Sequence, residues 1–211
     1  MSYGYLGDTS TKIKQVRKND GVISVTNALD LKSQGHLGGS LELIEEQTIS
    51  TDTSQVDFTS IKQSIYDVHL LYIINAKSDT DNKDFALRVS TSGTFQTGTD
   101  YHRALFELNS ANSSTESIAT TAGQMDITQH TGNATNEVAN AYVYIYGAGN
   151  SSSMTYCTSH STTRDNGGNF KLIFGGGAYD QAGEVDGFRI FMDGSGDIAS
   201  GVFRLYGVKQ L

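Results

Sequence analysis

The sequence predicts an all-β protein: an antiparallel β-sandwich with an extended N-terminal arm. Short apolar segments recur along the chain, several of them alternating, and clusters of Gly, Asn, Asp and Ser separate them. No helical periodicity extends beyond two turns, and only 18 % of the residues are charged. Short strands with turn signals between them are typical of a sandwich, and we expect its topology to resemble a jelly roll.

The expected strands run from Leu41 to Val208. The segment Tyr66–Asn75 becomes continuously apolar, which is typical of a central strand covered on both faces. Residues 109–123 carry little pattern and form either a long loop or an edge excursion. The other expected strands are 41–49, 56–58, 85–90, 101–108, 125–127, 140–146, 154–161 and 169–174, followed by a terminal hairpin of 185–192 and 198–208. Since the last strand ends almost at the C-terminus, we expect the tail to be locked into a sheet.

The N-terminal segment differs from the rest of the chain. It carries a basic cluster between residues 12 and 18, although the formal net charge of the chain is −8, and Gly38-Gly39 follows as a hinge. A segment this short cannot bury a core of its own. We therefore divide the chain into an attachment or assembly arm over 1–38 and a sandwich domain over 39–211. The alternative is an arm that lies on its own domain.

The composition argues against several classes of protein. A net charge of −8 disfavours nucleic acid and anionic membranes as partners. No apolar run approaches the roughly 20 residues of a membrane-spanning helix, so we expect no membrane insertion. The N-terminus lacks the pattern of a secretion signal, which favours synthesis in a cytoplasm without independent export. The single cysteine, Cys157, excludes an intrachain disulfide.

Candidate metal sites are weak. Asp79 and Asp81 alternate as in a calcium loop, but Lys83 takes the place of a third oxygen ligand and no glycine follows. We interpret Ser78–Asp84 as a solvated turn stabilised by its Asp and Asn side chains. The five histidines, none spaced as zinc ligands, are His36, His69, His102, His130 and His160. On its strand, His69 is expected to be partly buried and hydrogen-bonded.

Candidate catalytic groups are equally weak. Gly175–Gly177 lacks the Lys-Ser/Thr and the helix of a phosphate loop, and we interpret it as a loop that lets chains approach closely. The spacing of Cys157 and His160 offers two ligands, which do not make a site. Glu45 and Glu46 point to opposite faces of a strand, a poor arrangement for an acid–base pair. We expect no catalytic residues, no cofactor and no metal.

Three tyrosines share one face of an expected strand. Tyr142, Tyr144 and Tyr146 alternate with apolar residues. Such a ladder can stack on carbohydrate, form an interface patch, or line the core with its hydroxyls at the rim. All three interpretations remain open from the sequence.

Several stretches, in order along the chain, resemble structural proteins of tailed phages that infect marine cyanobacteria. The junction Gly35–Ile44, with Gly-His-Leu-Gly-Gly-Ser-Leu, is the most specific of them, whereas the closing Gly201–Val208 is weak alone. The others are Tyr3–Asp8 with Lys14–Val16 and Lys18-Asn19, Ile65–His69, and Gly132–Val138. The resemblance implies a virion component, described as structural or tail-fibre-like, and brings no catalytic residues.

We therefore expect a non-enzymatic virion protein, assembled in the host cytoplasm and attached through its arm. It would be either a tail-fibre or adhesin-like module or a decoration component of the capsid or tail. Other virion proteins and further copies are the expected partners, with a trimer favoured by analogy. A host surface glycan could bind loops 109–123, 147–153 and 175–181. The alternative is a carbohydrate-binding or carbohydrate-active jelly-roll module, which as an enzyme would need two carboxylates about 5–10 Å apart.

Overall fold

A computed structural model describes Thr26, Leu29 and residues 40–209. Residues 42–209 lie in one compact unit. Antiparallel sheets packed together confirm the predicted all-β sandwich. The predicted arm, 1–38, lies outside the described residues except for Thr26 and Leu29, so its attachment role stays a prediction.

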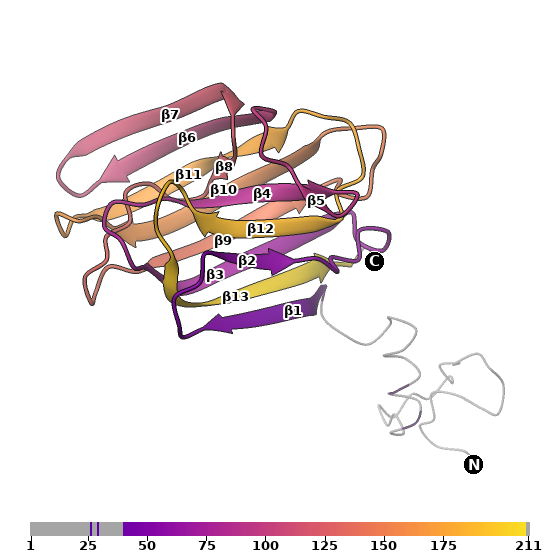
Figure 1. The fold of residues 1–211 in the computed structure, drawn as a ribbon, viewed down its shortest axis with the longest axis horizontal. Helices are drawn as coiled ribbons and strands as arrows, with labels where there is room; N and C mark the ends of the chain where they lie inside the picture. The colour runs from indigo at the N-terminus through magenta and orange to yellow at the C-terminus, as the bar shows by residue number, and fades with distance from the viewer. Residues whose placement is uncertain (1–25, 27–28, 30–39, 210–211) are drawn as a thin grey trace, which may run out of the picture. The chain divides into compact units, whose positions relative to one another are not determined.

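Two antiparallel sheets make up this unit, and in Figure 1 the smaller one lies in front of the larger. The larger sheet has eight strands in the order β1 (Leu41–Ile49), β13 (Ile198–Val208), β3 (Val68–Ser78), β9 (Ala139–Tyr146), β10 (Thr155–Arg164), β11 (Phe170–Tyr179), β6 (Tyr101–Asn109) and β7 (Ser113–Ala122). The smaller sheet has the order β2 (Gln55–Phe58), β12 (Gly187–Met192), β4 (Phe85–Thr91) and β5 (Thr94–Phe95), and β8 (Met125–Asp126) pairs with β4.

The core lies between the sheets and is built from alternate residues of each strand. On β4, Phe85, Leu87 and Val89 share the inward face, as their spacing predicts, and all three are fully buried. Phe203 of β13 and Phe188 of β12 are buried from opposite layers. Side chains of this size fill the roughly 10 Å space between two packed sheets.

The end of the chain confirms one prediction and corrects another. β13 pairs with β3 and lies between it and β1, so the C-terminal strand is inside the larger sheet, as predicted. The predicted terminal hairpin is wrong, because β12 belongs to the smaller sheet. Residues 193–197 carry the chain from one layer to the other. The same alternation suits a hairpin and such a crossing, since in both cases one face of each strand meets the core.

Three further predictions need correction. Gly175–Gly177 lies inside β11 and is not a loop. Residues 113–122 form the edge strand β7, so the edge excursion was the right alternative for this segment. Two of the three predicted glycan loops are therefore largely strand. For β3, the expected cover is complete on one face and partial on the other, where Leu70 is buried but Tyr72 and Ile74 are only half-buried.

The glycines of β11 do bring neighbouring strands close together. A Cβ atom at Gly175 would lie 2.1 Å from the carbonyl oxygen of Ala104 on β6. One at Gly176 would lie 2.2 Å from the carbonyl oxygen of Cys157 on β10. Only glycine fits at these two positions. Because glycine has no side chain, the surface of the sheet is recessed at this point.

Candidate interaction face

β6 and β11 turn charged side chains toward the inside of the sandwich. Glu107 is 3 % exposed and Lys171 is 5 % exposed, and Lys171 Nζ lies 2.9 Å from Glu107 Oε1. Arg103 forms a second pair with Asp126 of β8. Removing an ion pair from water is costly, so apolar residues are the usual occupants of such positions. The inner side of this part of the larger sheet is therefore unusually polar.

Several apolar residues of the same two strands face outward, whereas Leu105 and Ile173 face inward beside the ion pair and are buried. On β6 the outward-facing residues are Phe106 and Leu108, and on β11 they are Phe170, Leu172 and Phe174. Phe170 is 51 % exposed. A sheet with one solvated face normally places its apolar residues inward and its polar residues outward. Here apolar side chains stand on both faces, and the inner face also holds the buried ion pairs. The apolar outer face of the larger sheet is therefore a candidate contact surface.

A continuous row of rings crosses this outer face. Cross-strand partners share a face of an antiparallel sheet, and we call one such line of partners the aromatic row. Four of its rings are in contact one after another: the ring centroids are 5.3 Å apart for Tyr142 and His160, 5.9 Å for His160 and Phe174, and 5.6 Å for Phe174 and Phe106. From β13 to β7 the row consists of Arg204, Tyr72, Tyr142, His160, Phe174, Phe106 and Glu116. Its charges therefore stand only at the two ends, where Arg204 also contacts Glu46 of β1.

The next row is graded in size. Following the same strands, it consists of Tyr206, Leu70, Tyr144, Thr158, Gly176, Ala104 and Ile118. Large residues lie on β13, β3 and β9, and small ones on β11 and β6. The face consequently has a ridge on one side of β10 and a hollow on the other.

The ridge consists of Tyr144 and Tyr146, whose rings stack at 6.4 Å. The hollow has a volume of about 520 Å³. Its floor includes Gly176, Ala104 and Ala178, and its rim includes Tyr156, His102 and Ile118. A smaller hollow of about 240 Å³ continues it toward Phe106 and Phe174.

The predicted tyrosine ladder lies on this face. Tyr142 is 39 % exposed and Tyr146 is 37 % exposed, while the alternating Ala141, Val143 and Ile145 are buried. The interpretation of the ladder as core wall is therefore wrong. Carbohydrate stacking and an interface patch remain as candidate roles.

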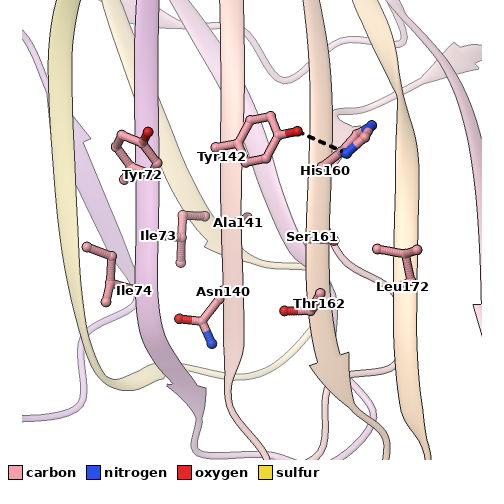
Figure 2. Close-up of a pocket in the computed structure, with 10 residues that line it drawn as sticks. All are labelled: Tyr72, Ile73, Ile74, Asn140, Ala141, Tyr142, His160, Ser161, Thr162 and Leu172. Carbon is pink, nitrogen blue, oxygen red and sulfur yellow. Dashed lines mark hydrogen bonds between the residues drawn. The ribbon is translucent and has the colours of Figure 1, made fainter. Parts of the chain in front are cut away.

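A third hollow, of about 480 Å³, lies beside the aromatic row and is shown in Figure 2. Tyr72, Tyr142 and His160 stand in one line from three strands, and the Tyr142 hydroxyl lies 3.0 Å from His160 Nδ1. Asn140 and Thr162 stand in the next line, with Ile74 and Leu172 on either side. The hollow combines ring faces with amide and hydroxyl groups, so it could hold a polar ring such as a sugar.

The groups considered as metal ligands have structural partners. Asp79 Oδ1 accepts the backbone N–H of Asp197, and Asp81 Oδ1 accepts that of Asn133. His69 is fully buried, its Nε2 lies 2.7 Å from the Ile61 carbonyl oxygen, and burial lowers its pKa. The predicted hydrogen bond is present. Within residues 40–209, no group of three or more His, Cys, Asp or Glu is placed to hold a metal ion.

The other predicted pairs do not come together. Cys157 is buried on the inner face of β10, where burial raises the pKa of its thiol to about 12, whereas His160 stands on the outer face. Glu46 contacts Arg204, and Glu45 contacts Gln47. His36 lies outside the described residues.

The buried pair Glu107 and Lys171 was not predicted from the sequence, although the alternation of β6 placed Glu107 on the same face as Leu105.

Burial of the Asp126 carboxyl has a measurable consequence. Desolvation, partly offset by the nearby Arg103, raises the pKa of Asp126 from 3.8 to about 6. Between pH 3.8 and about pH 6 the folded state keeps the Asp126 proton that the unfolded state has already lost. The stability that this proton contributes is therefore fully present at low pH and is lost as the pH rises through 6. We expect the free energy of unfolding of the wild type, relative to Asp126→Asn, to fall by roughly 2 kcal/mol from pH 4 to pH 7.

Urea unfolding of both proteins at several pH values measures this difference. Comparing them removes the contributions of titrating groups that do not interact with Asp126, such as His69. A constant difference between the two proteins across this range would show that Asp126 is not desolvated in the fold.

Comparison with known proteins identifies no relative of the chain. No protein-family model matches the chain, and neither a curated protein nor a solved structure is found that is similar to it. The described residues include no helix long and apolar enough to cross a membrane.

Proposed function

We propose that this protein is a non-enzymatic structural component of a tailed-phage virion. Its arm, 1–38, attaches it to the particle, and its sandwich packs against other proteins through the outer face of the larger sheet. The exposed apolar residues on the outer face of β6 and β11, including Leu108, Phe170 and Phe174, support this role more than any other observation. The resemblance of the sequence to structural proteins of cyanobacterial phages supports the virion as the site of assembly.

The extent and charge of the face favour a protein partner. The aromatic row alone crosses seven strands. Contiguous apolar patches of more than a few hundred Å² on a soluble protein typically mark interaction sites. Along this row the charged residues stand at the two ends, and its centre carries rings and a histidine. Such a surface suits an interface core, from which charged residues are depleted.

Purified particles test the proposal directly. We expect mass spectrometry of particles, after a density-gradient step, to find the protein in fixed proportion to the other virion proteins. Deleting residues 1–38 should remove it from the particle while the circular dichroism of the sandwich is retained. Absence of the full-length protein from particles would contradict the virion role, and normal incorporation of the truncated form would contradict the role of the arm.

Carbohydrate binding is the second candidate, and the hollow of Figure 2 favours it. Its tyrosine faces could stack on a sugar ring while Asn140 and Thr162 offer hydrogen bonds. The residues lining the three hollows include a single carboxylate, Glu116, so they do not offer the pair of acids that a glycosidase needs. Glycan-array binding by the protein, lost on Tyr142→Ala, would favour an adhesin over a decoration component.

A further inference from the structure

We propose that the outer face of the larger sheet binds the same face of a second copy, about a two-fold axis that runs along β10. This inference rests on the proposed assembly role and specifies its partner. An axis along β10 exchanges the strands on either side of it, so that β9 of one copy meets β11 of the other. It likewise brings β3 to β6 and β13 to β7.

Shape is the first argument for this axis. In the graded row, Tyr144 and Gly176 are the partners of Thr158 on opposite sides of β10. In the neighbouring row, Tyr146 and Ala178 flank Tyr156 in the same way. The two-fold rotation therefore places the tyrosine ridge of each copy over the hollow of the other, and it does so twice.

Charge is the second argument. The same rotation brings Arg204, at one end of the aromatic row, over Glu116 at the other end in the second copy. It also places Tyr142 over Phe174 and Tyr72 over Phe106, so that rings meet rings. A two-fold axis perpendicular to the strands and through the aromatic row would instead place Glu116 over Glu116 and Arg204 over Arg204. Complementary potentials and packed rings favour the axis along β10.

The area of the face is sufficient for a stable dimer. Neighbouring strands lie about 4.8 Å apart and alternate side chains about 6.7 Å apart, so seven strands and four rows cover roughly 900 Å². A standard interface buries about 800 Å² on each partner. Two sheets that pack face to face keep their strands within about 30° of each other, which the alignment along β10 satisfies.

Filling the hollow provides the first test. Ala104 is exposed on the hollow floor, so Ala104→Trp should leave the fold intact and exclude the ridge of the second copy. By sedimentation equilibrium we expect a dimer for the full-length wild type and at least a hundredfold higher dissociation constant for Ala104→Trp. The matched control is Thr94→Trp, which adds the same ring at an exposed position of β5 in the smaller sheet and should dimerise normally.

Charge reversal tests the direction of the axis. Glu116→Arg and Arg204→Glu each create two like-charge contacts in the proposed dimer, and each should weaken it about tenfold. The double variant recreates two opposite-charge contacts and should recover most of the loss. Under the perpendicular axis each of these residues faces its own copy, so like charges meet in the wild type and in every variant, and neither single variant would weaken the dimer.

The outcomes separate this inference from the proposed function. A monomeric wild type at all concentrations, a trimer, or a dimer unaffected by Ala104→Trp would overturn the inference. Glycan binding by a monomer would assign the face to carbohydrate. If the protein is nevertheless found in purified particles, the virion role stands and only the identity of the partner is wrong.

Discussion

Lys171→Met is expected to lower the free energy of unfolding by about 3–5 kcal/mol, because it removes the closest cation from the buried Glu107 carboxylate and leaves only the half-exposed His130 ring, 3.6 Å away. The ammonium of Lys171 lies 2.9 Å from Glu107 and 3.9 Å from Asp165. Both members of the closer pair are almost fully buried. An exposed pair would contribute only about 0–1 kcal/mol, so the size of the effect reports which face of β6 and β11 is inside.

Chemical denaturation of the wild type, Lys171→Met and the double variant Lys171→Met/Glu107→Leu measures this effect. We expect the double variant to regain most of the lost stability, because apolar side chains of similar volume often replace a buried ion pair without loss. A loss below about 1 kcal/mol for the single variant would show that the pair is solvated. The assignment of apolar residues to the outer face would then be wrong as well.

Gly176→Ala is expected to cost at least about 3 kcal/mol, at the upper end of overpacking effects, or to prevent folding. The added Cβ would lie 2.2 Å from the Cys157 carbonyl oxygen, a backbone atom that can move only if β10 and β11 separate. The substitution therefore disrupts the sheet at the floor of the hollow.

Thermal unfolding and the soluble yield on expression measure this effect. The control is Gly183→Ala, because a Cβ at Gly183 would meet nothing within 4 Å. We expect this control to stay within about 0.5 kcal/mol of the wild type. Equal stability of the two variants would contradict the close approach of β10 and β11.

The strands could be predicted from the sequence where alternation is clear. Phe85, Leu87 and Val89 mark β4, and the segment from Leu41 to Ile49 is β1 as expected. The glycines of β11 misled the prediction, since a glycine run ordinarily indicates a loop. Their close contacts with β6 and β10 come from strands distant in sequence, so no local pattern could show that they continue a strand.

The candidate face could be predicted only in part. The spacing of Tyr142, Tyr144 and Tyr146 places them together on one side of a strand, as the structure has them. On β6, alternation separates Phe106 from Glu107 but does not say which faces inward. That choice depends on Lys171, which β11 brings beside β6. Strand order and register also determine the aromatic row, and neither can be read from a single sequence.

Cryo-electron microscopy of the purified particle tests the central claim most directly. The claim is that the outer face of the larger sheet is an assembly interface of a virion protein. We predict density for the sandwich in the particle, with Phe106, Tyr142 and Phe174 buried against another subunit. Absence of the protein from the particle, or a sandwich whose aromatic row faces open solvent, would contradict the claim.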